Sequence, residues 1–435
     1  MINMRKRAEA YRGDWATRDA DAKHDRNAIT AAPDGGSNPG PLWNGYYVRN
    51  PLLYLFLRIS DAFARMLAAI RPDRDGRGAI TPSPARILII NPAHLGDVIL
   101  ATAILAPIKA RFPAARIGFL TGSWSRPALE GHPMVDWLHS VDHWKLSRAA
   151  ASPIHKFLHY RRTRSRALKE IRATGYDVAI DLYFFYPNLI PIAWRANIPV
   201  RIGYTSGGYA PLLTHAVEWR DSGAHVVDHC RALLEPLGIT REFAASYGPS
   251  LPESRIGDGS DHVVAPDGIG TDGYVVIHPG TGADHKNWPI EKWRALARGL
   301  AGEGIRIVFT GTGAAETALT DSIAIETRDS VNLCGRLDWP SFVEVVRSAR
   351  LVIGVDSAGV HAASAVGTRS ISIVAGLSPH LFRPYGKKAR VLMAPVACSP
   401  CYRGCAAMAC VRDVTPESVR AAALEQLDAA RAVNG

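Results

Sequence analysis

The chain has 435 residues, which is too long for one ordinary domain and predicts two folded lobes with additional segments. Apolar residues make up 47% and charged residues 21% of the chain, the composition of a soluble globular protein. A formal net charge of +11 favours anionic partners such as phosphorylated ligands, acidic glycolipid or a membrane surface. Nucleic acid is not an expected partner, because the chain shows no recognised nucleic-acid-binding module.

The N-terminal residues and the cysteines indicate a cytoplasmic protein. The first 25 residues carry no apolar core behind their basic side chains, so they do not resemble a secretory signal. Six cysteines in a long chain without a signal point to reduced thiols rather than to a disulfide framework. No uncharged apolar stretch is long enough to predict a transmembrane helix.

The first 80 residues are predicted to form an extension with one helix. Residues up to Pro41 are charged, rich in Gly, Asn and Pro, and aperiodic, which predicts disorder. A helix is expected in NPLLYLFLRISDAFARMLAAIR, where Arg58, Asp61 and Arg65 form a narrow polar stripe. Two interpretations stay open: a helix docked on its own protein, or an interfacial membrane anchor. We expect the chain without the residues before Ile80 to remain a folded two-lobed core.

From Arg86 onward, short apolar strands alternate with helices. The strands ARILIIN, ARIGFLTG and YDVAIDLY are continuously apolar, as expected for parallel sheets covered on both faces. After the polar stretch Ser250–Gly273 the pattern restarts with YVVIHPG and continues through GIRIVFTG, VNLCG, LVIGVD and SISIVAG to a terminal helix. The fold class is therefore α/β, with two Rossmann-like lobes at residues 81–255 and 256–435.

Candidate chemistry follows the carboxyl ends of these strands, where such sheets bind ligands. Gly96 lets a ligand approach the backbone, and Asp97 at a helix N-terminus is favoured as a carboxylate that could accept a proton. A plain helix-capping aspartate is the competing interpretation. Lys286, in a glycine-rich loop, offers a point charge to a pyrophosphate. The amides of Ser357, Ala358 and Gly359 open a helix that can bind phosphate.

These segments together resemble glycosyltransferase family nine, the ADP-heptose:lipopolysaccharide heptosyltransferase family. The resemblance rests on RILIINPAHLGDVILATAIL, IHPGTGADHKNWPIEKW and LVIGVDSAGVHAASAVGT, and it covers the chain from Arg86 to the C-terminus. It implies a GT-B fold whose two lobes face a central cleft. It also implies that Asp97 is the catalytic base, that Thr281 and Lys286 contact the donor, and that Asp356 and His361 contact sugar or phosphate oxygens.

Two positions fit the family pattern less well. Ala358 stands where the family usually has glycine, with Gly359 following it, so the local loop geometry is open. Glu316 matches loosely a position near the nucleoside, and a surface glutamate is the favoured interpretation.

By this resemblance the protein is an inverting glycosyltransferase. It is expected to move heptose from ADP-heptose to the lipopolysaccharide core or a related cell-envelope glycan, with no cofactor or metal. The acceptor is an anionic glycolipid, which would bring the enzyme to the cytoplasmic face of the inner membrane. Two alternatives are a nucleotide-sugar epimerase of the same fold and a non-catalytic nucleotide-sugar-binding protein. Retention of Gly96 and Asp97 argues against the second.

Two further features of the sequence each allow two interpretations. The basic run HKFLHYRRTRSRALKEIR fits either a solvated helix face or the binding of an acidic acceptor. Cys398, Cys401, Cys405 and Cys410 form a ladder that could bind zinc or an iron–sulfur cluster. Their tight spacing in one short loop favours reduced thiols or a redox-sensitive pair.

Overall fold

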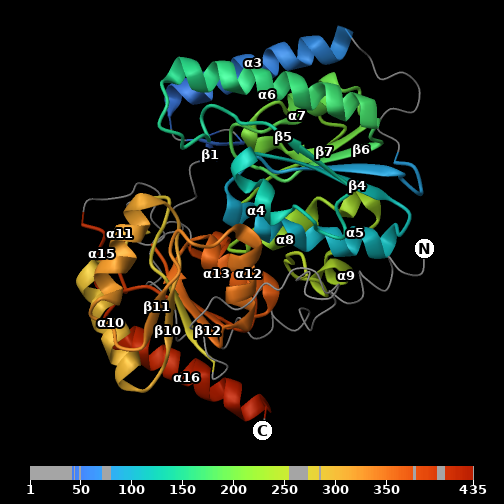
Figure 1. Ribbon diagram of the computed structural model, residues 1–435. Coiled ribbons are helices and arrows are strands. Elements are labelled where there is room, and N and C mark those ends of the chain that lie inside the picture. Colours follow the sequence, from blue (N-terminus) through green and yellow to red (C-terminus); the bar gives the residue numbers. More distant parts are fainter. Residues whose placement is uncertain are drawn as a thin grey trace. The chain divides into compact units, whose positions relative to one another are not determined.

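The computed structural model describes residues 42–43, 45–48, 50–70, 80–253, 273–283, 286–375, 379–398 and 407–434. The expected disorder up to Pro41 and most of the polar stretch Ser250–Gly273 lie outside these residues. The described residues form two compact units, the first ending at Gly248 and the second beginning at Pro249 (Figure 1). The predicted limits of the extension and lobes stay a prediction.

The first unit contains a six-stranded parallel sheet in the order β5-β4-β3-β6-β7-β8. Its strands are β3 (Arg86–Ile90), β4 (Arg116–Thr121), β5 (Trp137–Ser140), β6 (Val178–Asp181), β7 (Val200–Tyr204) and β8 (His215–Val217). A small antiparallel pair, β1 (Leu42–Trp43) and β2 (Tyr46–Tyr47), precedes them. The central strand β3 pairs with both β4 and β6, and its apolar side chains from Ile87 to Ile90 are fully buried.

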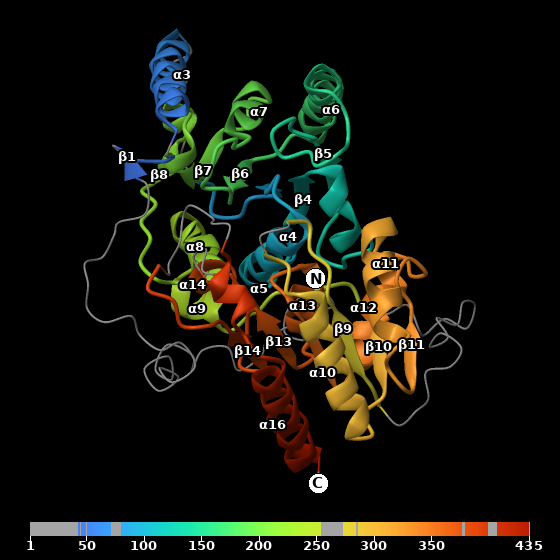
Figure 2. The ribbon, with the colours of Figure 1, turned by 90° about the vertical axis from the view of Figure 1, so that its left-hand side faces the viewer.

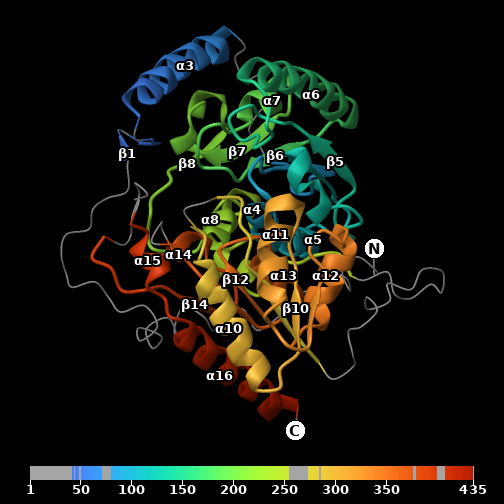
Figure 3. The ribbon, with the colours of Figure 1, turned by 60° about the vertical axis from the view of Figure 1, so that its left-hand side comes forward.

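Helices cover both faces of this sheet. The α-helices are α3 (Pro51–Ile70), α4 (Leu95–Ala101), α5 (Leu105–Arg111), α6 (Pro153–Thr174), α7 (Ile190–Arg195), α8 (Val226–Ala232) and α9 (Arg241–Ala245). The 3₁₀ turns are η1 (Thr102–Ile104), η2 (Ser123–Ala128), η3 (Thr205–Gly207), η4 (Ala210–Leu212) and η5 (Glu235–Leu237). In three views, α3, α7 and α6 lie along one side of the sheet, and α4, α5 and α8 lie along the other (Figures 1, 2 and 3).

The second unit has a separate six-stranded parallel sheet in the order β11-β10-β9-β12-β13-β14. Its strands are β9 (Val275–His278), β10 (Ile307–Phe309), β11 (Ser330–Asn332), β12 (Leu351–Val355), β13 (Ser370–Ile373) and β14 (Ala389–Leu392). Its helices are α10 (Ile290–Gly302), α11 (Gly313–Ala324), α12 (Trp339–Ser348), α13 (Ala358–Val366), α14 (Pro379–Phe382), α15 (Ala409–Arg412) and α16 (Pro416–Asn434).

The predicted α/β architecture with two parallel sheets is confirmed, and the departures have local causes. Between β3 and β4 the helical stretch is not continuous, because the turn η1 separates α4 from α5. Thr102 donates a side-chain hydrogen bond to the Ile99 carbonyl at 2.6 Å, and Pro107 has no N–H to donate. The edge strands β5, β8 and β14 are partly exposed, so they lack the continuous apolar run that identifies a buried strand.

Helix α3 packs on the first unit through a narrow stripe. Leu57, Asp61 and Ala64 are buried, whereas the large apolar side chains around them are exposed. The Asp61 carboxylate accepts hydrogen bonds from the Tyr46 hydroxyl at 2.9 Å and from the Tyr209 backbone N–H at 2.5 Å. Helix α3 is therefore docked on its own protein through this stripe, while most of its large apolar side chains face outward, so the interpretation as an interfacial anchor stays open. None of the described helices is long and apolar enough to cross a bilayer.

Candidate active site

Asp97 lies in the first turn of α4, directly beyond the carboxyl end of β3. The N-cap residue is His94, whose backbone N–H donates to the Asp97 carboxylate at 3.3 Å. The turn η2 fixes the loop before α4, because the Trp124 indole N–H and the Ser125 hydroxyl both donate to the Ala93 carbonyl, at 3.0 and 2.9 Å. Asp97 is thus not the N-cap itself. Its carboxylate contributes to capping and is partly exposed at the sheet edge, with Gly96 beside it.

The loop that follows β6 brings a tyrosine into the neighbourhood of Asp97. Asp181 ends β6, and its carboxylate accepts from the backbone N–H groups of Tyr183 at 3.0 Å and Leu189 at 2.8 Å. Burial raises the pKa of Asp181 to about 7 against these hydrogen bonds. Burial also raises the pKa of the Tyr183 hydroxyl, and the negative charges of Asp97 and Asp181 add to that effect. Tyr183 follows β6, the strand that pairs with β3, and no sequence motif marked it.

A polar group formed by Ser123, Asp142 and His159 also lies at the carboxyl edge of the first sheet, and the sequence motifs did not predict it. Asp142, which follows β5, accepts from the Ser123 N–H at 2.7 Å and the Ser123 hydroxyl at 2.9 Å. The His159 Nε2 atom of α6 lies 2.7 Å from the same carboxylate. The available signal was positional, since Ser123 and Asp142 both follow strands of a parallel sheet. This group ties α6 to the carboxyl edge of the sheet.

In the second unit, the structure brings three of the predicted donor residues together. The Lys286 ammonium is 2.5 Å from one Asp356 carboxylate oxygen, and the His361 Nε2 atom is 3.4 Å from the other. Burial opposes the charged carboxylate. The hydrogen bond from His361 and the charge of Lys286 nevertheless hold the pKa of Asp356 well below its usual range. Residues 70 positions apart in sequence thus form one charged group at the ends of β9 and β12.

The start of α13 explains the unusual Ala358-Gly359 pair. Ser357 is the N-cap, and Ala358 is the first helical residue. A Cβ atom on Gly359 would lie 2.9 Å from the His278 ring, so glycine is required at 359. The side-chain oxygen of Ser357 and the Nδ1 atom of His361 are buried and have no hydrogen-bond partner among the described residues. These are polar atoms that a bound donor could satisfy.

Glu316 and His278 complete the edge of the second sheet. The Glu316 carboxylate accepts from the Thr312 N–H at 2.7 Å and lies against Gly280 and Gly311, where a Cβ atom would collide with it. Glu316 is partly exposed, which agrees with the surface interpretation, and its carboxylate also lies between two loops that follow strands. His278 Nδ1 lies 3.0 Å from the Thr310 hydroxyl, and burial lowers the pKa of its ring. Thr281 is partly exposed in the same loop as Gly280.

The cysteine ladder falls partly outside the described residues. Cys401 and Cys405 are among the residues not described, while Cys398 is exposed and Cys410 is buried. Among the residues that are described, no group of three or more His, Cys, Asp or Glu side chains is arranged to hold a metal ion. The competing interpretations of the ladder stay as the sequence left them.

Comparisons with known proteins agree on one family. Residues 164–411 match the family model described as glycosyltransferase family 9 (heptosyltransferase). That range includes Lys286, Asp356 and His361 but not Asp97. Lipopolysaccharide heptosyltransferase 3 of Escherichia coli is 29% identical over 301 residues, which are 67% of this chain and 83% of that protein.

Two solved structures share the fold. One is a glycosyl transferase family 9 protein from Veillonella parvula, with a TM-score of 0.63 and 21% identity, covering 79% of this chain and 97% of that chain. The other is the E. coli ADP-heptose lipopolysaccharide heptosyltransferase II, with a TM-score of 0.60 and 22% identity, covering 79% of this chain and 98% of that chain.

Proposed function

The chain belongs to glycosyltransferase family 9, the heptosyltransferase family, and from that membership we propose that it transfers heptose from ADP-heptose to a lipopolysaccharide-core or related cell-envelope acceptor. That the protein is a glycosyltransferase follows from the family itself. The donor and acceptor are proposed from the relatives, which are named as lipopolysaccharide heptosyltransferases and, in one solved structure, as an ADP-heptose enzyme.

The observation that carries the proposal is the Lys286–Asp356–His361 group beside the start of α13. A lysine ammonium has three donors, so Lys286 can keep Asp356 and still reach a diphosphate oxygen. The free amides at the start of α13, from Ser357 to Gly359, favour an anion at the same edge. We propose Thr281 as a donor contact because it is partly exposed in the loop after β9, and Gly96 as a further contact on the family resemblance alone.

The proposed reaction is a single displacement with inversion. The Asp97 carboxylate accepts the proton of the acceptor hydroxyl as the hydroxyl oxygen attacks the anomeric carbon. The bond between that carbon and the diphosphate oxygen breaks, and ADP departs with both bonding electrons. Lys286 and the amides of α13 stabilise the negative charge that develops on the leaving diphosphate. No metal ion is needed for this charge, because protein groups supply the compensation.

The proposed setting is the cytoplasmic face of the inner membrane. A lipopolysaccharide-core acceptor is an anionic lipid, so the enzyme must reach a membrane surface to use it. The net charge of +11 suits that surface, because anionic leaflets attract basic proteins. We therefore place the protein in the cytoplasm, with peripheral association to the inner membrane.

A donor panel tests the proposal. Purified protein is melted with ADP-heptose, ADP-glucose, ADP and UDP-N-acetylglucosamine, since a ligand that binds the folded state raises Tm by an amount that grows with its concentration relative to its Kd. We expect ADP-heptose to give the largest shift, and Lys286→Met to abolish it. Lys169→Met, which removes an exposed lysine of α6, should leave the shift intact.

Transfer is then measured on heptose-deficient lipopolysaccharide. Formation of a heptosylated product supports the proposal. Stabilisation by UDP-N-acetylglucosamine with conversion of its sugar would instead favour an epimerase. Donor binding without transfer to any acceptor would favour a non-catalytic protein.

A further inference from the structure

Exposed apolar side chains are concentrated on two helices of the first unit. Twelve large apolar side chains are exposed in the described part of the chain, and eleven of them belong to α3, to α6 or to Trp144 in the segment before α6. The seven on α3 are Leu52, Leu55, Phe56, Ile59, Phe63, Met66 and Ile70. Side chains scattered over a surface need no explanation, but a contiguous set of this size on a monomer marks an interaction site.

Helix α3 presents the reverse of an ordinary surface helix. Its inward stripe includes the carboxylate of Asp61, which is 3% exposed, while Ile59 and Phe63 are 61% and 56% exposed. A helix that stabilised only its own unit would place its apolar side in the core and its carboxylate in water. The buried hydrogen bonds of Asp61 fix the helix in this orientation, because turning it would leave the Tyr46 hydroxyl and the Tyr209 N–H without their acceptor.

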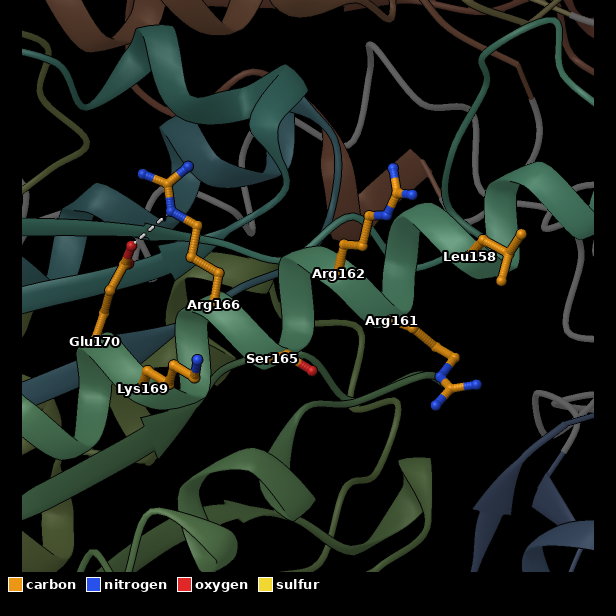
Figure 4. Close-up of a pocket in the computed structure, with 7 residues that line it drawn as sticks. All are labelled: Leu158, Arg161, Arg162, Ser165, Arg166, Lys169 and Glu170. Carbon is orange, nitrogen blue, oxygen red and sulfur yellow. Dashed lines mark hydrogen bonds and ion pairs between the residues drawn. The ribbon is translucent and has the colours of Figure 1, made fainter.

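Helix α6 continues the same face with basic side chains. Its first turns expose Ile154, Phe157 and Leu158. The stripe then continues at helical spacing through Arg161, Arg162 and Lys169, which line a shallow depression with Leu158. The close-up marks one interaction among the seven residues drawn, between Arg166 and Glu170, while the Arg161 and Arg162 guanidinium groups extend away from the helix (Figure 4).

The two helices are linked by side-chain contacts. Phe56 of α3 packs edge-to-face on Tyr186, with ring centroids 5.6 Å apart. On its other side, Tyr186 lies 4.9 Å from the Lys145 ammonium and 6.2 Å from the His143 ring. His143 in turn contacts Tyr160 of α6 at 4.6 Å. All three ribbon views place α3 and α6 on the same side of the first sheet (Figures 1, 2 and 3).

We propose that the outward faces of α3 and α6 together form a docking surface for an anionic lipid bilayer. The exposed apolar side chains enter the boundary between headgroups and acyl chains, and the arginines contact lipid phosphates. Charge complementarity selects this occupant over a second copy of the chain, because Arg58, Arg65 and the α6 arginines would repel their counterparts across a symmetric interface. The inference deepens the proposed function and rests on it for the lipid-borne acceptor.

The docking surface adjoins the acceptor edge of the first unit. Tyr186, which Phe56 contacts, belongs to the same loop as Tyr183. That loop follows β6, which pairs with β3, the strand before Asp97, and the negative charge of Asp97 contributes to the raised pKa of Tyr183. A bilayer bound at α3 and α6 is therefore one short loop away from the candidate base. This placement suits an acceptor whose reacting hydroxyl stands just above the membrane.

Vesicle flotation tests the surface without donor or acceptor present. The full chain is incubated with phosphatidylcholine vesicles and with vesicles containing about 30% phosphatidylglycerol. We expect binding to the anionic vesicles that weakens with salt. The triple variant Leu55→Gln, Ile59→Gln and Phe63→Gln should lower the partition coefficient at least about a hundredfold, since each residue loses a burial that favours the interface. The double variant Arg161→Gln and Arg162→Gln should lower it about tenfold or more.

The matched control replaces one exposed apolar and one exposed basic side chain outside the docking surface. The variant Ile325→Gln with Arg328→Gln replaces an 86% exposed isoleucine and an exposed arginine of the second unit, and it should bind vesicles like the wild type. Failure of the wild type to bind anionic vesicles, or equal binding by the triple variant, would overturn the proposal. A wild-type dimer that the triple variant converts to monomer, without vesicle binding, would assign the face to a second copy instead.

Failure of this inference can be told apart from failure of the proposed function. Heptose transfer to a water-soluble acceptor should be the same in the wild type and the triple variant, because the three substituted side chains are exposed on the outer side of α3. Transfer to acceptor in anionic vesicles should fall in the triple variant and, to a smaller extent, in the arginine double variant, but not in the Ile325→Gln, Arg328→Gln control. Absence of transfer in every protein, with vesicle binding intact, would reject the function and keep the surface.

Discussion

Asp97 serves both local structure and, by our proposal, proton transfer. The hydrogen bond that it accepts from His94 is 3.3 Å long, which is at the weak end for an N–H donor. An ionised carboxylate has about four acceptor positions, so capping leaves capacity for a substrate hydroxyl. The capping interpretation and the catalytic interpretation of Asp97 are therefore compatible, and only a functional measurement separates their weights.

We predict that Asp97→Asn lowers kcat about 10²–10⁴-fold, because the amide cannot accept the acceptor proton. The asparagine keeps a carbonyl oxygen for His94, so folding should be preserved. ADP-heptose affinity, measured by titration calorimetry, should be unchanged, and Glu130→Gln, which neutralises an exposed carboxylate, should have normal kcat. A well-folded Asp97→Asn protein that retains most of its turnover would remove Asp97 from the role of base.

His143 gives the first unit a pH-dependent stability. Burial and, to a smaller extent, the charge of Lys145 together lower its pKa from 6.5 to about 4. The geometry agrees, because the Lys145 backbone N–H donates to His143 Nδ1 at 3.2 Å and so requires a neutral ring. The aromatic rings of Trp144, Tyr160 and Tyr186 surround it and offer no carboxylate.

We predict that this contribution to stability is complete above pH 6.5 and is lost as pH falls toward 4. In that range the unfolded chain binds a proton that the folded chain excludes. The loss is at most about 3 kcal/mol in the free energy of unfolding. Urea denaturation at pH 7.5 and pH 5 measures it. His143→Asn can still accept from the Lys145 N–H but does not titrate, so its difference between the two pH values should be smaller. Equal differences would contradict the assignment.

At the scale of elements, the contact between α13 and β9 shapes the donor edge. His278 ends β9, and its ring lies where a side chain on Gly359 would be. The Gly354 position in β12 is crowded in the same way, since a Cβ there would lie 2.9 Å from the His278 carbonyl oxygen. The family pattern asks for glycine one position earlier than this chain provides it, and the close approach of β9 explains why Gly359 is the one that must be kept.

We predict that Gly359→Ala lowers the free energy of unfolding of the second unit by about 1–3 kcal/mol, the usual cost of forcing atoms into a packed site. Displacement of α13 should also weaken ADP-heptose binding. The control is Gly302→Ala at the end of α10, where no atom lies within 4 Å of the added Cβ. It should stay within about 0.5 kcal/mol of the wild type. Equal melting temperatures for the two variants would show that α13 can shift without cost.

The packing of α3 changes the expected result of deleting the residues before Ile80. Leu57 packs with Tyr46, Val48, Leu53, Tyr54 and Tyr186, and Ala64 packs with Ile190 and Leu212. Removing the residues before Ile80 would expose Tyr186, Ile190 and Leu212 and would leave the Tyr209 N–H without its acceptor. The expectation that such a deletion leaves an undisturbed core is therefore revised. We now expect it to destabilise the first unit, and for this reason substitutions on the outward face are the sharper test of membrane binding.

At the scale of the whole molecule, positive charge is the proposed replacement for a metal ion. The chain carries a formal net charge of +11, and Lys286 lies at the candidate donor site. We predict that heptose transfer proceeds at an unchanged rate in millimolar EDTA, measured as ADP release. Loss of turnover that magnesium or manganese restores would contradict this. Elemental analysis of the same preparation would show whether the cysteine ladder carries stoichiometric zinc or iron.

The sequence by itself determined the architecture and predicted the candidate donor residues. Continuous apolar runs such as RILII predict buried parallel strands, and the order of strands and helices then fixes which loops meet at the carboxyl edge. Lys286 was predicted from its place in a glycine-rich loop after such a strand, whereas Asp356 and His361 were predicted from the family resemblance.

Only the tertiary structure decided the features that depend on residues distant in sequence. The contact between the Glu316 carboxylate and the loop of Gly280 could not be predicted, and Tyr183 and Asp142 carried no motif, because their surroundings come from segments distant in sequence. The polarity of α3 was open for the same reason. Helical spacing shows that one side is apolar and one stripe is polar, but which side docks depends on whether a partner can satisfy Asp61. Tyr46 and Tyr209 supply that partner, and so the apolar side faces outward.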